Sequence, residues 1–224
     1  MLLSMMWLYC SDTYMPLLTM IVYLVLWSRI AKKELLLFCY LLFNTVLFAI
    51  TNVMADKGAN NLFLYHFYSL FEFAALTWYI LRSLLRKNLI VVGSIIIGYA
   101  VLWGLNIVFY ESLDMYNSNS LTLGGFLLLL QSMYYMLQLS KSDEILYFQR
   151  LPTFWIVSGF LVSYAISTLA VLTYKWYVAP DDNKEANRIW IIVSVANIVK
   201  FGLIIIGLIC YKRPKQFTRQ PLLL

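Results

Sequence analysis

Histidine, cysteine and charged residues are scarce in this chain of 224 residues, and each shortage excludes a class of function. A single histidine, His66, supplies too few ligands for the sites in which proteins hold catalytic zinc. Three widely spaced cysteines offer neither a disulfide framework nor a paired-cysteine metal motif. Glycine-rich phosphate loops and a serine-nucleophile elbow are also missing. We therefore expect no catalytic residues, no metal site and no cofactor.

Hydrophobic residues, in contrast, form 62% of the chain and charged residues only 12%, a composition typical of membrane proteins. A bilayer core about 30 Å thick needs roughly 20 apolar residues per helix, and seven stretches reach that length. They predict a single all-α domain over residues 1–224, a polytopic bundle of seven transmembrane helices. We expect Pro16 and Pro152 at helix starts. The predicted spans lie near residues 15–31, 34–54, 61–81, 89–110, 119–139, 153–173 and 187–211.

Basic residues gather in alternate gaps between these stretches. One side receives twelve of the seventeen lysines and arginines, while the other side carries most of the acidic loop residues. The positive-inside rule then predicts an N-terminus outside and a C-terminus in the cytoplasm. Because the charges fall in short gaps, they form no basic face for nucleic acid. The twelve residues are Arg29, Lys32, Lys33, Arg82, Arg86, Lys87, Lys141, Arg150, Lys212, Arg213, Lys215 and Arg219.

Two charged residues, Glu72 and Lys200, stand near the centres of the third and seventh spans. A charge at mid-membrane costs roughly 2.5 to 3.5 kcal/mol on insertion scales, so such residues usually face the bundle interior and find partners. Both spans begin outside, and at a rise of 1.5 Å per residue the two positions share a depth to within about 3 Å. The sequence predicts an ion pair between them.

Polar and aromatic residues extend this pair into stripes on the third span, which includes Tyr79, and on the seventh span, which includes Trp190. We interpret the stripes as the lining of an outward-facing polar cavity for a small amphipathic ligand; a purely structural polar core that fixes helix register is the alternative. Glu111 and Trp155 are placed at its outer mouth. The candidate ligand-binding or polar-core residues are Glu72, Lys200, His66, Tyr65, Tyr68, Ser69, Asn44, Asn197 and Ser194.

Small residues at four-residue spacing predict close helix packing in the sixth span, where Gly159, Ser163 and Ser167 share one face. Ser94 and Gly98 give the fourth span a shorter version of the same pattern. We interpret both sets as packing surfaces rather than binding residues.

A lysine in the seventh span opposite a glutamate in the third is similar to the retinal-binding arrangement of microbial rhodopsins, and "KFGLI" at residues 200–204 resembles its context. The similarity is superficial, because Ala196 stands where that pattern has an aspartate. Retinal held through Lys200 therefore remains a minor interpretation.

Four segments together resemble an uncharacterised seven-span family common in Bacteroidota genomes. They are "NNLFLYHFYSLFEF", "YESLDMYNSNS", "PTFWIVSGFLVSY" and "NIVKF", spread between about residues 58 and 205. The resemblance implies a multi-pass protein of the bacterial cytoplasmic (inner) membrane and implies no activity. The residues that match the family pattern are His66, Glu72, Glu111, Ser112, Phe154, Trp155, Ser158, Gly159 and Asn197.

These observations favour a non-enzymatic membrane protein that binds or senses a small or lipid-like ligand. The first alternative is a structural or accessory subunit of a membrane complex, and a transporter or retinal-type photoreceptor ranks third. The expected partners are membrane lipid, a small hydrophobic or amphipathic ligand and a membrane-protein partner, with no nucleic acid.

Overall fold

Helices account for all the regular secondary structure in the part of the chain described by the computed structural model, residues 11–30, 34–142, 148–178 and 183–211. Side chains are described for these ranges except 174–188. Six of the basic residues used to predict orientation, Lys32, Lys33, Lys212, Arg213, Lys215 and Arg219, lie outside the described residues. The helices are α2 (Ser11–Val25), η1 (Trp27–Arg29), α3 (Leu35–Asp56), α4 (Leu62–Thr77), η3 (Trp78–Leu84), α5 (Leu89–Phe109), α6 (Ser118–Ser140), α7 (Pro152–Val178) and α8 (Asn183–Cys210).

Five of these helices, α3, α5, α6, α7 and α8, are long and apolar enough to cross a membrane. The third predicted span divides into α4 and the π-helical segment η3, which follows without interruption and carries the helical run from Leu62 to Leu84. The first predicted span is shorter than expected, because α2 has 15 residues and gives way to the single turn η1.

Pro152 is the first residue of α7, as predicted, whereas Pro16 is not at a helix start. Helix α2 begins at Ser11, so Pro16 lies inside it. Proline has no N–H and cannot bond to the carbonyl four residues earlier, which is that of Asp12. The helix therefore extends past its proline at the loss of one backbone hydrogen bond near its N-terminal end.

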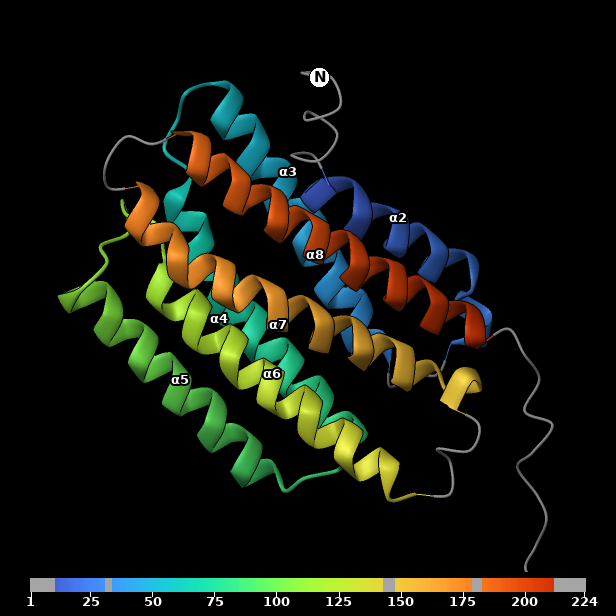
Figure 1. Cartoon of the computed structure of the whole chain (residues 1–224). Helices are drawn as coiled ribbons and strands as arrows, with labels where there is room; N and C mark the ends of the chain where they lie inside the picture. Colours follow the sequence, from blue (N-terminus) through green and yellow to red (C-terminus); the bar gives the residue numbers. More distant parts are fainter. Residues whose placement is uncertain (1–10, 31–33, 143–147, 179–182, 212–224) are drawn as a thin grey trace, which may run out of the picture.

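The helices run side by side in an elongated bundle (Figure 1). Helices α5, α6, α7, α8 and α2 follow one another across the front of this view, and α3 and α4 lie behind them. The most extensive packing joins α7 to α8 and α6 to α7. Helix α2 closes the bundle against α3 and α8, so residues from both ends of the sequence meet in the core.

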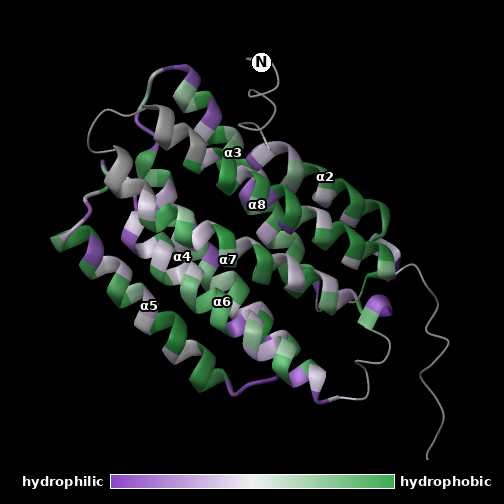
Figure 2. Cartoon of the chain, viewed as in Figure 1, coloured by the Kyte–Doolittle hydropathy of each residue, from purple (hydrophilic) through white to green (hydrophobic). Residues whose placement is uncertain are grey.

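The distribution of polarity is the reverse of that in a soluble bundle. Hydrophobic residues run along the helices (Figure 2), and large apolar side chains such as Ile97 and Val108 on α5 point outward. Glu34, Glu72 and Lys200 are buried instead. An outer surface of this kind suits hydrocarbon better than water.

Close contact between α7 and α8 depends on glycine. A side chain at Gly159 would meet the backbone carbonyl of Lys200 at 2.7 Å, and one at Gly207 would meet the Pro152 carbonyl at 2.7 Å. The predicted packing face of the sixth span is thus confirmed at Gly159. The prediction for the fourth span is wrong, because Ser94 and Gly98 are exposed on α5 and a Cβ at Gly98 would meet nothing within 4 Å.

Candidate functional site

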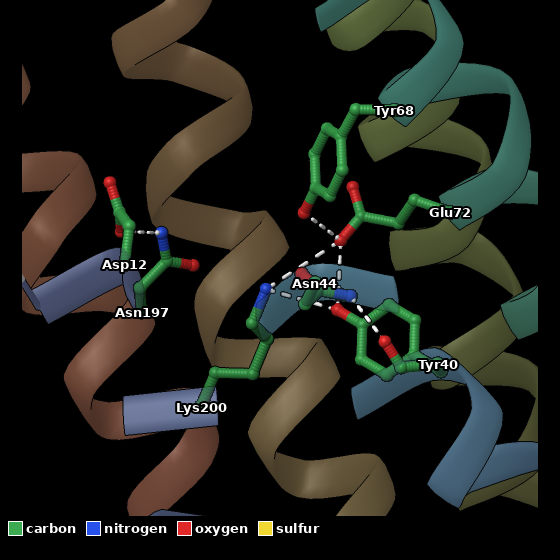
Figure 3. A network of polar contacts seen from close by, with 7 residues as sticks. All are labelled: Asp12, Tyr40, Asn44, Tyr68, Glu72, Asn197 and Lys200. Carbon is green, nitrogen blue, oxygen red and sulfur yellow. Dashed lines mark hydrogen bonds and ion pairs between the residues drawn. The ribbon is translucent and has the colours of Figure 1, made fainter. Parts of the chain in front are cut away.

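The predicted ion pair is present in the bundle core. Lys200 Nζ lies 3.6 Å from Glu72 Oε1, and both side chains are almost fully buried. The same carboxylate oxygen accepts hydrogen bonds from Tyr68 at 2.6 Å and from Tyr40 at 2.9 Å (Figure 3). Lys200 Nζ donates in turn to the Tyr40 hydroxyl at 3.3 Å. Tyr40 on α3, absent from the predicted site, therefore links the two charged residues.

Aromatic rings surround the Lys200 ammonium group. Its Nζ lies 4.9 Å from the centroid of the Phe201 ring, 5.8 Å from Tyr164 and 6.0 Å from Tyr40. Rings at such distances attract a cation through their quadrupole, which offsets part of the cost of removing the ammonium from water.

A cavity of about 70 Å³ opens beside the ion pair, and we call it the core cavity. Side chains of α2, α3, α4, α6, α7 and α8 line it, together with Tyr116 from the connection between α5 and α6. That volume has room for several water molecules. Glu72, Lys200, Tyr65, Tyr68 and Asn197, all predicted from the sequence, are among its lining residues.

Asp12 is a lining residue that the sequence did not indicate, because it precedes the first predicted span and looks like an ordinary loop charge. The start of α2 at Ser11 brings it into the bundle, where only 7% of its surface is exposed. Its Oδ1 accepts a hydrogen bond of 2.7 Å from Asn197 Nδ2 on α8. Figure 3 shows these two residues on one side and Glu72, Tyr68 and Tyr40 on the other, with the Lys200 ammonium directed toward the second group.

Three aromatic rings form another part of the cavity wall. Tyr65 on α4, Tyr116 and Trp190 on α8 have ring centroids 5.9 to 6.3 Å apart in every pairing, with steeply inclined planes. We call these residues the aromatic trio. Tyr65 was predicted as lining and Trp190 belongs to the predicted stripe of the seventh span, whereas Tyr116 was not predicted.

Asn44 and Ser194 are buried near the pair but do not line the core cavity. Asn44 Nδ2 donates to the backbone carbonyl of Tyr40 on its own helix at 2.8 Å, which leaves its side chain turned to α3. The Ser194 hydroxyl has no hydrogen-bond partner among the described residues. Both residues are thus buried in the polar core, as predicted, but the cavity lining predicted for Asn44 is wrong.

His66 and Ser69 also lie outside the cavity lining, and they hold the α5–α6 connection instead. His66 Nε2 is 3.0 Å from the backbone carbonyl of Met115. Ser69 donates to the His66 carbonyl and accepts from Asn117 Nδ2 at 2.7 Å. Both residues are buried in the polar core, as predicted. The cavity lining predicted for His66 is wrong, because it faces the neighbouring connection.

Glu111 is buried rather than placed at a cavity mouth. Its carboxylate accepts from Asn106 Nδ2 at 3.0 Å, from Ser118 Oγ at 2.6 Å and from the backbone N–H of Asn119 at 3.0 Å. These contacts place a carboxylate at the N-terminus of α6, where free N–H groups favour negative charge. Glu111 thus anchors the start of α6, and its predicted role at the mouth is wrong.

Trp155 lies at the other end of the bundle. It stands in the first turn of α7 and donates to the backbone carbonyl of Gln149 at 3.1 Å, the same oxygen approached by Cys210 Sγ from the end of α8. Glu111 precedes α6, and α7 follows α6 in the opposite direction, so Trp155 and Glu111 cannot share a mouth. The prediction for Trp155 is wrong for this reason.

Another buried carboxylate, Glu34, lies at that end of the bundle. It accepts hydrogen bonds from Tyr79 in η3 at 2.6 Å and from Tyr211, just after α8, at 2.7 Å. Tyr79 belongs to the polar stripe recognised in the sequence, but its partner comes from the start of α3. Glu34 follows the basic residues between the first two predicted spans, and nothing in the sequence indicates that such a glutamate is buried.

The site contains acidic, basic, phenolic and amide groups, and the described residues hold no cluster of three or more His, Cys, Asp or Glu side chains suited to a metal ion. These groups offer charge pairing, hydrogen bonding and ring contacts to a ligand. Comparison of the chain with protein-family models, curated proteins and solved structures gives no match.

Proposed function

We propose that this chain is a seven-span protein of a bacterial cytoplasmic membrane, with its N-terminus outside, that binds or senses a small or lipid-like ligand in the core cavity without catalysing a reaction. Five long apolar helices support membrane insertion. Helix α4 with η3, and α2 with η1, supply the two remaining spans of this proposal.

The observation that carries the proposal is a cavity beside a buried ion pair. Removing a charge from water costs free energy. Charges that served only to fix helix register would therefore be expected in a tightly packed core, with no open space beside them. Here Glu72 and Lys200 border an open space whose walls also present Tyr68, Tyr164 and Asn197. Apolar walls with a few convergent polar groups are typical of small-molecule sites.

A structural or accessory subunit is the second candidate, favoured by the surface of α5. This helix stands at the edge of the bundle in Figure 1 and exposes Ile97, Val101 and Val108. Such a face could pack against another membrane protein as well as against lipid. A transporter or a retinal-type photoreceptor ranks third.

Filling the cavity tests the main proposal. Ser167 on α7 lines the core cavity, and Ser167→Phe would occupy part of it; Ala165→Phe, two residues earlier, points outward and serves as the matched control. Native mass spectrometry of protein purified from its own membrane should detect a bound small molecule in wild type and in Ala165→Phe and not in Ser167→Phe. Only bulk lipid in all three, or equal retention in both variants, would rule out the cavity as a ligand site.

A further inference from the structure

We propose that the core cavity selects a small organic cation, an amine or quaternary ammonium compound, with Asp12 as its charge partner and the aromatic trio as its ring contacts. This inference rests on the proposed function, because it names the class of ligand for the same cavity.

The charges of the lining do not balance. Two carboxylates, Asp12 and Glu72, and one ammonium group, Lys200, border the cavity. Lys200 is already engaged by Glu72 at 3.6 Å and by the Tyr40 hydroxyl. Asp12 makes no ion pair with a described residue, and a neutral amide from Asn197 is its hydrogen-bond partner. A buried carboxylate without a cation is costly, and a cationic ligand would remove that cost.

Asp12 also has an unused acceptor that a ligand could reach. Asn197 occupies Oδ1, whereas Oδ2 forms no hydrogen bond to the described residues. The hydroxyl of Tyr164, another lining residue, is buried and likewise lacks a hydrogen-bond partner in the described part of the chain. A cationic ligand that carries an ammonium N–H or a hydroxyl group could form hydrogen bonds with Asp12 Oδ2 and with the Tyr164 hydroxyl.

The wall formed by the aromatic trio suits the same ligand class. Cations are attracted to ring faces within about 6 Å of the centroid, most strongly to tryptophan. The ring centroids of the trio lie 5.9 to 6.3 Å from one another, and the ring planes are inclined to each other. A small cation bound against the trio would therefore contact several rings at once.

Lys200 shows that these groups suit an ammonium ion. Its own ammonium is held by one carboxylate, one tyrosine hydroxyl and the faces of neighbouring rings. Asp12, the Tyr164 hydroxyl and the aromatic trio provide the same three kinds of group around the rest of the cavity. An anionic ligand would instead face two carboxylates and a lysine that is already paired.

The test uses full-length protein in lipid nanodiscs and isothermal titration with methylammonium, tetramethylammonium and choline. The matched neutral compound is 3,3-dimethylbutan-1-ol, which has the shape of choline with carbon in place of the charged nitrogen. We expect at least one cation to bind, and choline to bind roughly tenfold or more tightly than its neutral isostere. This comparison needs no variant and therefore does not depend on how a mutant folds.

Asp12→Asn keeps the shape of the side chain and should weaken cation binding by roughly tenfold or more. Asp56→Asn, at the exposed end of α3, is the control and should leave the affinity unchanged. Equal binding of choline and its isostere, an unchanged affinity in folded Asp12→Asn, or no binding of any of the three cations would overturn the cation proposal. The proposal that the cavity is a ligand site would still stand after any of these results if native mass spectrometry found a molecule that is bound to wild type and lost from Ser167→Phe.

Discussion

Tyr40 connects the two charged residues of the core. Its hydroxyl donates to Glu72 and accepts from Lys200, while Tyr68 donates to the same carboxylate oxygen. A carboxylate removed from water thus receives two phenolic donors in addition to the ammonium group. Because all these groups are enclosed, removing one partner leaves another buried and unsatisfied, which costs more than the net contribution of the intact pair.

Variants of the pair should therefore be strongly non-additive. Glu72→Gln and Lys200→Met should each lower the free energy of unfolding by about 3 to 5 kcal/mol, because each leaves an uncompensated buried charge. The double variant should recover much of that loss. Reversible denaturation in detergent measures all three. Lys141→Met, exposed at the end of α6, is the control and should change stability little. Additive effects in the double variant would contradict a direct pairing.

At the scale of helices, the contact between α7 and α8 positions Lys200. Gly159 on α7 faces the Lys200 backbone so closely that a methyl group would collide with its carbonyl oxygen. Gly207 repeats this arrangement against Pro152, farther along the same pair of helices. The two glycines bring α8 close enough to α7 for Lys200 to reach Glu72 across the core.

Two glycines of α8 provide a matched test of this packing. At Gly207 a Cβ would lie 2.7 Å from both the Pro152 carbonyl and a side-chain carbon of Ile156, whereas at Gly202 it would meet nothing within 4 Å. Gly207→Ala should destabilise the bundle by about 1 to 3 kcal/mol through overpacking. Gly202→Ala should be neutral or stabilising by up to about 1 kcal/mol, because alanine is the better helix former. Thermal unfolding in one detergent gives both values, and equal effects would show that the contact does not limit packing.

At the scale of the whole molecule, the described part of the bundle exposes apolar residues and buries charged ones such as Glu34, Glu72 and Lys200. Orientation in a membrane follows from the charges of the connections between helices. Ser112 and Lys141 flank α6 at its two ends, and both are exposed. They are therefore suited to test whether the outer and inner sides are as proposed.

We expect opposite accessibility at these two positions. In a background without the native cysteines Cys10, Cys39 and Cys210, Ser112→Cys should react with a membrane-impermeant maleimide in intact cells. Lys141→Cys should react only after the cells are permeabilised. The reversed result would invert the proposed orientation, and labelling of both in intact cells would show that α6 does not separate two compartments.

Sequence alone determined the helical character of the chain and the depth of its charges. The lengths of the apolar segments and the rise per residue of a helix place Glu72 and Lys200 at the same depth along the bundle. The ion pair between them confirms that placement. The same periodicity identifies Tyr65, Tyr68 and Asn197 as inward-facing. These properties depend on local geometry within one helix, which the order of residues specifies directly.

Only the tertiary structure decided which helices meet and which ends are folded in. It brought Asp12 from the start of α2 into the cavity, joined Tyr40 to the ion pair and turned His66 and Glu111 toward the α5–α6 connection. It also placed Trp155 at the far end of the bundle. A helical wheel gives the direction of a side chain relative to its own axis. Its partner depends on how separate helices pack, which is a property of the assembled bundle.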